Sequence, residues 1–117
     1  MRVVRIIPDL QVRDLVAARK FWTGYLGLAE ESLGLDWVTR FVPDGGGDGL
    51  QVVTADESAP ATPSISIAVD DVDAAYAEAV RRGYEIVHPL TDEPWGVRRF
   101  FVRDPDGNVL NILRHRG

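Results

Sequence analysis

Residue types suited to catalysis or metal binding are few and scattered in this chain. There is no cysteine, so thiol nucleophiles, thiolate metal sites and disulfides are excluded. The two histidines, His88 and His115, show no His-Glu or His-x-His spacing, and we interpret each as a strand or surface histidine. Ser64 has no base nearby in the sequence, which a serine nucleophile would need. The remaining acid–base candidates form no recognisable dyad: Asp9, Tyr84 and Arg99.

An internal repeat determines which elements position these residues. Residues 12–18 resemble residues 69–75, at an offset of 57. Residues 41–53 resemble residues 101–113 at two places, both at an offset of 60. Because the matching segments occur in the same order at similar offsets, we interpret the chain as two copies of one unit. Chance similarity between short apolar strings is the alternative.

The first copy is predicted to form a strand, a helix and three further strands. Residues 3–11 are apolar and β-branched, as in a buried strand. Asp14 is a predicted N-cap, and Gly27 follows the last apolar residue at helical spacing. The glycine-rich residues 44–49 predict a hairpin turn rather than a phosphate loop, since neither a helix nor a Lys-Ser/Thr pair follows. The three strands are expected at about residues 28–33, 36–42 and 49–54.

The second copy repeats this order after a polar, proline-bearing linker at residues 55–63. Asp71 should cap its helix and Gly83 should end it. Its strands are expected at about residues 64–69, 84–90, 97–103 and 108–114. The predicted fold class is α+β, with two βαβββ modules in tandem. Residues 1–117 would form a single domain, with module 1 at about 1–54 and module 2 at about 64–117.

Composition narrows the classes of partner. The chain has 45% hydrophobic and 26% charged residues, which is typical of a globular domain. Its net charge of −5 repels phosphate backbones, so no nucleic-acid partner is predicted. The N-terminal residues lack a signal-peptide pattern, and no apolar stretch is long enough to cross a bilayer. We therefore expect a cytoplasmic protein without a membrane partner, which the absence of cysteine also fits.

Several segments resemble sequence signatures of the vicinal oxygen chelate superfamily, which includes glyoxalases, bleomycin-resistance proteins and dioxygenases. The resemblance spans nearly the whole chain and is specific for the fold rather than for one chemistry. It implies that the sheets of the two modules curl around a shared cavity. The matching segments are Val12-Arg13-Asp14, Phe21-Trp22, Leu26-Gly27-Leu28, residues 69–75 with Gly83, and residues 104–110.

The resemblance also implies where a metal would bind in metalloenzyme members. Four inward side chains, usually His, Gln or Glu, lie on the first and last strands of each module. Carried over onto this chain, the positions are Ile7, Gln51, Ser64 and Asn111. Ile7 has no donor atom, and the other three offer only weak neutral oxygens. No metal site and no cofactor are therefore predicted, and a metal-dependent lyase or dioxygenase is disfavoured.

Without a metal, the resemblance implies a binding role. The bleomycin-resistance branch is similar to a homodimeric sponge that sequesters an antibiotic in clefts lined by both subunits, and related proteins bind mitomycin-type and enediyne natural products. We predict a metal-independent protein that sequesters an aromatic natural product or antibiotic, as a homodimer. The alternative is a metal-independent enzyme of the same family, a lyase, isomerase or dioxygenase-like member acting on a small metabolite. A purely structural interaction module is a weaker third interpretation.

The chain contains aromatic side chains suited to such a ligand. Strand alternation places Trp37, Thr39 and Phe41 on one face. Trp95, in a Pro-Trp-Gly corner, is the aromatic residue most expected to touch a ligand. At the offset of 60, the positions equivalent to 37, 39 and 41 are Val97, Arg99 and Phe101.

Alternative roles remain open for several of these residues. The aromatic rings of Trp37, Phe41 and Phe101 could instead fill the core. Arg99 could hold a ligand oxygen or form an exposed salt bridge. The sequence does not show which strand face lines the cavity. No catalytic residue is predicted, and the predicted ligand-binding residues are Trp37, Phe41, Gln51, Ser64, Trp95, Arg99, Phe101 and Asn111.

Overall fold

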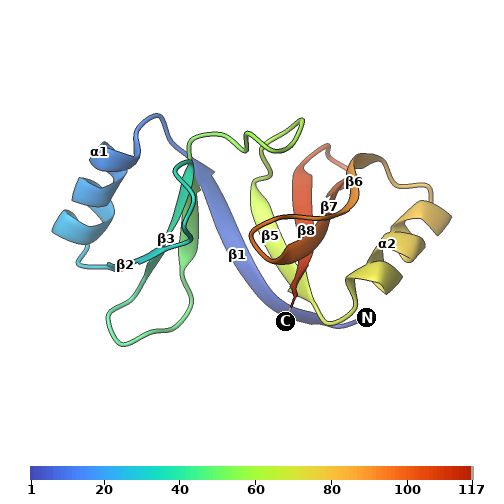
Figure 1. Ribbon diagram of the computed structural model, residues 1–117, viewed down its shortest axis with the longest axis horizontal. Helices are drawn as coiled ribbons and strands as arrows, with labels where there is room; N and C mark the ends of the chain where they lie inside the picture. The colour runs from blue at the N-terminus through green and yellow to red at the C-terminus, as the bar shows by residue number, and fades with distance from the viewer. Residues whose placement is uncertain (117) are drawn as a thin grey trace. The chain divides into compact units, whose positions relative to one another are not determined.

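The computed structural model describes residues 1–116, so the predicted domain end at residue 117 lies outside the described residues. The chain divides into two compact units, each with a sheet and a helical segment (Figure 1). The first unit is Ile7–Ser58, and the second unit is Met1–Ile6 with residues 59–116. The first unit ends inside the predicted linker. Residues 1–6 join the second unit, where Asp70 N donates to the carbonyl oxygen of Arg2 at 3.0 Å.

The first unit has the predicted order of elements. Strand β1 (Val3–Gln11) begins in the second unit and continues into this one, where it runs parallel to β4. The strands of the first unit are ordered β2-β3-β4-β1. After β1, its elements are α1 (Leu15–Arg19), η1 (Lys20–Tyr25), β2 (Ala29–Ser32), β3 (Val38–Val42) and β4 (Leu50–Val53).

The helix of the first unit changes type halfway along, which the sequence did not predict. Asp14 caps it as expected, since its carboxylate accepts from Val16 N at 2.9 Å. After Arg19 the backbone becomes π-helical, with Leu26 N donating to the carbonyl oxygen of Phe21. Gly27 then ends the segment with φ +73°, the left-handed region that favours glycine.

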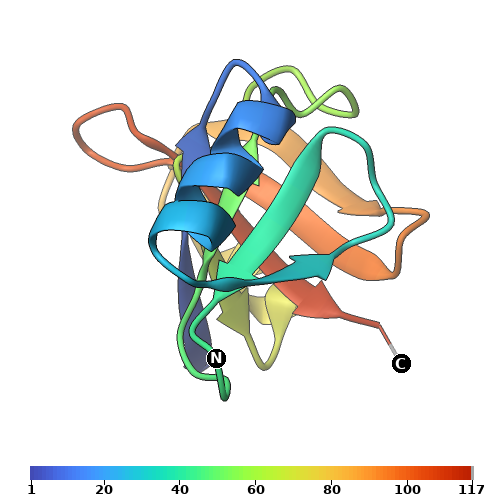
Figure 2. The ribbon, with the colours of Figure 1, turned by 90° about the vertical axis from the view of Figure 1, so that its left-hand side faces the viewer.

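Helix α1 packs on the first unit's sheet and forms its core, as Figure 2 shows. Buried Leu15 and Ala18 contact Phe41 of β3 and Val52 of β4. The ring of Trp22 stacks on that of Phe41, with centroids 6.3 Å apart. Phe41 therefore lies on the helix-facing side of its strand.

The second unit contains β5 (Ile65–Val69), α2 (Val72–Arg81), β6 (Ile86–Asp92), β7 (Val97–Arg103) and β8 (Val109–His115). Its strand order is β1-β5-β8-β7-β6, and β5 runs parallel to β8. Asp71 caps α2 through Ala74 N at 3.0 Å, and Gly83 follows the helix at φ +75°. Both were predicted.

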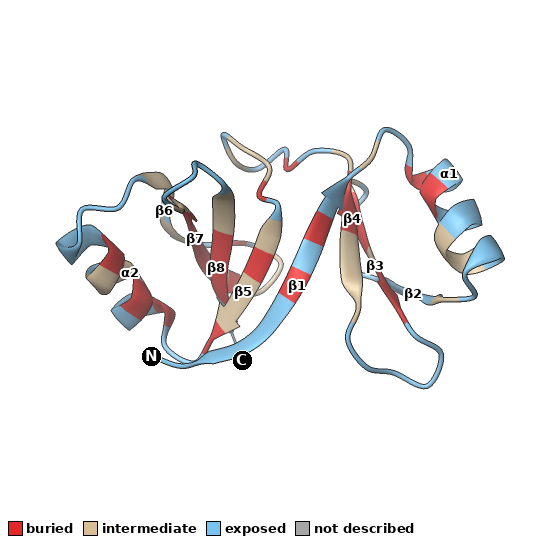
Figure 3. Cartoon of the chain, turned by 180° about the vertical axis from the view of Figure 1, so that it is seen from behind, coloured by how far each residue is buried: buried red, intermediate tan, exposed pale blue. Residues whose placement is uncertain are grey.

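The core of the second unit lies where α2 packs on one side of its sheet. The helix contributes the buried residues Val72, Ala75 and Ala79. Figure 3 shows buried segments along α2. The strands contribute Val69, Phe100, Val102 and Ile112. Odd-numbered residues of β5 and even-numbered residues of β7 and β8 therefore face α2, and their neighbours face the other side.

The two units confirm the α+β fold class of paired βαβββ modules, but the predicted offset fails in one strand. Gln51 and Asn111 are equivalent at an offset of 60, because each lies next to the first strand of its module. The residue opposite Gln51 on β3 is Arg40, whereas the residue opposite Asn111 on β7 is Phe101. These two residues are 61 apart, so the offset of 60 predicted for β3 and β7 is wrong by one residue.

The sequence predicted no segment long and apolar enough to cross a bilayer. Within residues 1–116, no helix combines the length and hydropathy that a membrane span requires.

Candidate functional site

A row of four side chains crosses the second unit's sheet on the face opposite α2. Ser66 of β5 lies opposite Asn111 of β8, which lies opposite Phe101 of β7, which lies opposite His88 of β6. Their neighbours Ile67, Phe100 and Ile112 pack on the α2 side. Because successive strand residues alternate between faces, the row occupies the other side. We call these four residues the second-unit row.

Only one of the two polar atoms of the Asn111 side-chain amide forms a hydrogen bond within this row. Its Nδ2 donates to Ser66 Oγ at 3.1 Å. Its Oδ1 is buried and has no hydrogen-bond partner among residues 1–116. Ser66 and Asn111 are 2% and 9% exposed. A buried carbonyl oxygen without a donor is unfavourable, so this atom is suited to accept from a ligand.

At the other end of the row, His88 packs beside Phe101. Their ring centroids are 5.1 Å apart. The Nε2 of His88 is buried without a hydrogen-bond partner among the described residues, and it lies 3.6 Å from a carboxylate oxygen of Glu93. The sequence predicted only an ordinary strand or surface histidine at position 88. The pairing of β6 with β7 shifts register on either side of His88. Strict alternation along β6 therefore does not predict that His88 lies opposite Phe101.

A buried ion pair supports this face of the sheet. Arg99 Nε donates to Glu93 Oε2 at 2.7 Å, and the two side chains are only 4% and 7% exposed. The guanidinium carbon of Arg99 lies 5.0 Å from the Trp95 ring centroid and 4.7 Å from that of Phe101. The sequence left a ligand contact or an exposed salt bridge open for Arg99. The structure shows a buried salt bridge with cation–π contacts.

The first unit carries an equivalent row with different chemistry. Asp9 of β1 lies opposite Gln51 of β4, which lies opposite Arg40 of β3, which lies opposite Glu31 of β2. Gln51 Nε2 donates to Asp9 Oδ1 at 3.1 Å, and Arg40 Nε lies 3.4 Å from Glu31 Oε1. We call these four residues the first-unit row. Asp9, one of the acid–base candidates of the sequence, is buried and accepts from Gln51.

The observed pairing between strands assigns two of the four family positions to other residues than the sequence predicted. Asp9 and Ser66, rather than Ile7 and Ser64, lie opposite Gln51 and Asn111. Ile7 is buried two residues before Asp9, and Ser64 is exposed and precedes β5. Both pairs are 57 residues apart, so the repeat alone could not distinguish them. Only the pairing between strands does so.

The remaining predicted residues lie in different surroundings. Phe41 is fully buried against α1 and fills the core, which was the alternative open for it. Trp37 is partly buried just before β3, and its carbonyl oxygen accepts from Thr54 N. Trp95 is partly buried in the turn between β6 and β7. Tyr84 is exposed and precedes β6.

The donor atoms of neither row suit a divalent metal. The first-unit row offers one carboxylate and one amide at the family positions, and the second-unit row offers a hydroxyl and an amide. Stable sites commonly use at least three imidazole, thiolate or carboxylate ligands. Among residues 1–116, no group of three or more His, Asp or Glu side chains could hold a metal ion.

Comparison with known proteins agrees with this architecture. The Glyoxalase/Bleomycin resistance protein/Dioxygenase superfamily matches residues 2–112. Two curated relatives, each described as "Putative glyoxylase CFP32", come from Mycobacterium bovis and Mycobacterium tuberculosis. Each is 31% identical over 126 residues, which cover 93% of this chain and 46% of the relative. The chain thus spans about half the length of these curated relatives.

Solved structures show the same fold. A superfamily member from Vibrio splendidus 12B01 has a TM-score of 0.69 at 16% identity, covering 97% of this chain and 99% of its own. A structure from Legionella pneumophila described as an NAD-dependent benzaldehyde dehydrogenase has a TM-score of 0.74 at 20% identity, covering 96% and 100%. At these identities the likeness concerns the fold alone. The match across residues 2–112 is decisive, and the chain belongs to the glyoxalase/bleomycin resistance protein/dioxygenase superfamily.

Proposed function

We propose that this protein is a cytoplasmic, metal-independent binding protein that sequesters a planar aromatic natural product or antibiotic. One observation carries the proposal. Phe101 lies between two residues, Asn111 and His88, each with a buried polar atom that lacks a partner among residues 1–116. A flat ligand with polar groups on opposite edges could satisfy both atoms. Such a combination of apolar surface and few fixed polar groups is typical of ligand sites.

The surrounding side chains favour an aromatic ligand. Trp95, Arg99, Phe101 and His88 form successive contacts between flat groups, each at about 5 Å. Phe101 and Arg99 are almost wholly buried, so their role is to hold the neighbouring groups in place. Trp95 is partly exposed and would contact the ligand. Trp37, Gln51 and Ser64 remain proposed contacts, whereas the position of Phe41 in the core favours a structural role.

Metal independence is part of the proposal because of the donor atoms. Members of the superfamily that use a metal hold it with side chains on the first and last strands of each module. Here those strands carry one carboxylate, two amides and one hydroxyl: Asp9, Gln51, Asn111 and Ser66. This set does not fit a catalytic divalent ion. Elemental analysis of protein purified without chelator should show no stoichiometric metal, and a near-equimolar metal would overturn this part.

Quenching of tryptophan fluorescence tests the binding role. Planar antibiotics, quinone chromophores and flavin mononucleotide would serve as probes. We expect at least one to bind with a Kd at or below about 1 µM, and Asn111→Leu to weaken it about tenfold or more by removing the acceptor. Gln11→Leu, which changes an exposed amide of the first unit, is the control. Failure of every probe to bind would contradict the proposal.

A metal-independent enzyme is the second candidate, favoured by the contact of His88 with Glu93. A buried imidazole beside a carboxylate is a common arrangement for general acid–base catalysis. The tested ligand should be recovered after incubation and analysed by mass spectrometry. Recovery of unchanged ligand supports sequestration. A chemically altered ligand whose formation requires His88, judged by the variant His88→Gln, would replace sequestration with catalysis.

The protein is also proposed to act as a homodimer. Large apolar side chains are exposed in the first unit, and Phe21 and Tyr25 lie together with ring centroids 5.4 Å apart. Exposed apolar clusters of this kind commonly mark interfaces. Light scattering at micromolar concentration should give twice the chain mass, and Tyr25→Glu should shift the mass toward that of one chain. A single-chain mass for the unmodified protein would contradict the proposal.

A further inference from the structure

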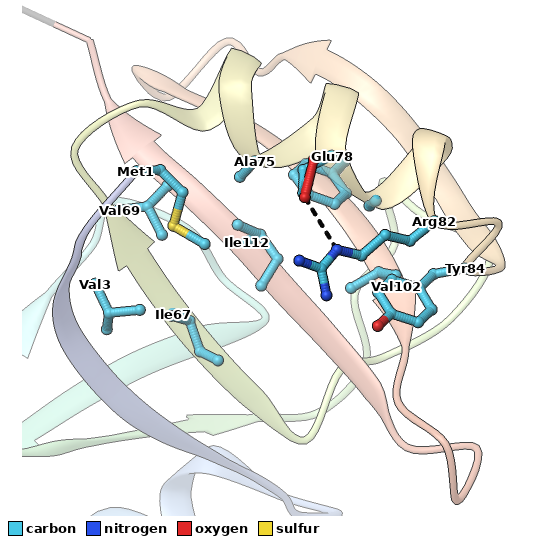
Figure 4. A pocket seen from close by; sticks show the side chains of 12 residues that line it. Met1, Val3, Ile67, Val69, Ala75, Glu78, Arg82, Tyr84, Val102 and Ile112 are labelled. Carbon is cyan, nitrogen blue, oxygen red and sulfur yellow. Dashed lines mark hydrogen bonds and ion pairs between the residues drawn. The ribbon is translucent and has the colours of Figure 1, made fainter.

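A second cavity lies in the second unit on the α2 side of the sheet, away from the second-unit row. Its volume is about 360 Å³, within the range of small-molecule sites. Nine of its twelve lining residues are apolar, and Figure 4 shows side chains from β1, β5, α2 and β8 around it. Phe100 and Ile112 line this cavity, whereas their neighbours Phe101 and Asn111 face the opposite side. The cavity is therefore separate from the candidate site.

The polar residues of the cavity include one carboxylate and one guanidinium. Within residues 1–116, its polar lining residues are Glu78, Arg82 and Tyr84. The Glu78 carboxylate is shared by two guanidinium groups, since Arg81 Nη2 and Arg82 Nε lie 2.5 and 3.0 Å from the same oxygen. The two charged lining residues, Glu78 and Arg82, therefore balance, and the charge of Arg81 lies outside the lining. Arg82 lines the cavity, whereas Arg81 does not.

The geometry of Arg82 suits an anion at the edge of this apolar cavity. Its Nε donates to Glu78, and Figure 4 shows this bond beside the labelled lining residues. Glu78 contacts Arg82 through Nε rather than through the terminal amino groups. The pKa of Arg82 is raised by the hydrogen bond with Glu78 and, after it, by a further side-chain hydrogen bond with Tyr84. A guanidinium fork of two N–H groups matches the two oxygens of a carboxylate. An apolar chamber with a cationic edge is complementary to a molecule that has an apolar body and one carboxylate.

We infer that this cavity binds a medium-chain carboxylic acid, with its alkyl chain against Ile67, Phe100 and Ile112 and its carboxylate on Arg82. Aliphatic groups gain from removal of their surface from water, and the lining provides that environment. This inference does not depend on the proposed aromatic ligand, because the two sites lie on opposite faces of the sheet.

Nuclear magnetic resonance titration with decanoate tests the inference on the full chain. We expect saturable shifts in α2, β5 and β8 amides near the cavity. Decanol and decylammonium, which have the same chain length, should bind about tenfold more weakly, the size of one charge-assisted hydrogen bond. Equal binding of all three compounds would show that Arg82 does not select a carboxylate, and would overturn the inference.

Two matched pairs of variants distinguish binding inside the cavity from a general effect of surface charge. Arg82→Ala should weaken decanoate about tenfold, whereas Arg81→Ala should change it less than about threefold, although both arginines contact Glu78. Ala79→Leu should block binding by filling the cavity, whereas Ala77→Leu, on the exposed side of α2, should not. Equal effects within the arginine pair, or shifts confined to the second-unit row, would overturn the inference even if Ala79→Leu failed to fold.

Discussion

The two units share one backbone plan but differ in the side chains that face away from their helices. The first-unit row contains two acids, an arginine and an amide, and its members contact one another across the strands. The second-unit row contains a hydroxyl, an amide, a phenyl ring and an imidazole, and two of its polar atoms lack partners among residues 1–116. The first-unit row also has such an atom, Arg40 Nε, but it lies 3.4 Å from its row neighbour Glu31. The second-unit row leaves the Asn111 oxygen without a hydrogen-bond partner among these residues.

The length of one hairpin explains why the rows differ at their third position. Measured from the equivalent residues Gln51 and Asn111, the β3–β4 connection is one residue longer than the β7–β8 connection, because the pairs are Arg40–Gln51 and Phe101–Asn111. In a strand, a shift of one residue moves a side chain to the opposite face. Phe41 therefore packs under α1, and the similar Phe101 faces away from α2. One residue in a turn thus decides whether the aromatic side chain packs against the helix of its unit or faces the other side of the sheet.

The largest expected effect tests this difference between the two phenylalanines. Phe41→Ala and Phe101→Ala should each lower the free energy of unfolding by about 3–5 kcal/mol, because both side chains are fully buried. Only Phe101→Ala should also abolish quenching by the aromatic probe. Urea denaturation and fluorescence titration measure both, with the exposed Leu33→Ala as control. Loss of probe binding in both variants alike would contradict the assignment of Phe41 to the core.

The ion pairs of the two units should also differ in strength. Glu93→Gln leaves Arg99 buried without its carboxylate and should cost about 3–5 kcal/mol. Glu31→Gln alters the more exposed Arg40 pair of the first unit and should cost at most about 1 kcal/mol. Urea denaturation at pH 7 compares them. If the two losses were equal, the burial of the Glu93–Arg99 pair would have no energetic consequence.

Removal of the helix caps should produce smaller losses. Asp71→Ala and Asp14→Ala each remove one hydrogen bond to the first turn and should cost about 0.5–2 kcal/mol. We expect the larger loss from Asp71, because α2 is a regular ten-residue helix and α1 has five residues before the π-helical segment. Thermal unfolding followed by circular dichroism checks this. Asn at either position should restore stability, and a null effect of Asp71→Ala would contradict its role as a cap.

The smallest effect concerns acid stability. Hydrogen bonds from Arg81 and then Arg82 lower the pKa of Glu78 from its ordinary value of 4.5 to about 2. Because the folded-state pKa is below the unfolded one, the stabilisation is present above about pH 4.5 and is lost as the pH falls toward 2. Glu78→Gln should therefore flatten the decline of stability in this window. Urea denaturation at several pH values would show it, with Glu57→Gln as a control, and parallel curves would contradict the prediction.

Local sequence rules predicted the elements well for definite physical reasons. Asp14 and Asp71 cap helices, and Gly27 and Gly83 end them at positive φ, because these features depend only on neighbouring backbone groups. The repeat identified two modules of one fold, and the last strands obey the predicted offset of 60. The π-helical segment after Arg19 was missed, since apolar spacing does not distinguish i−4 from i−5 bonding.

What only the tertiary structure decided is which residues share a face and which meet across strands. Ser66 rather than Ser64 meets Asn111, and Asp9 rather than Ile7 meets Gln51, because register depends on pairing between distant segments. The irregular pairing of β6 with β7 places His88 opposite Phe101, with Glu93 beside it, in the candidate site. The sequence by itself determined the duplicated α+β fold, whose signals are local and repeated. The site required the folded sheet, because a shift of one or two residues leaves a sequence pattern nearly unchanged but moves every side chain to new neighbours.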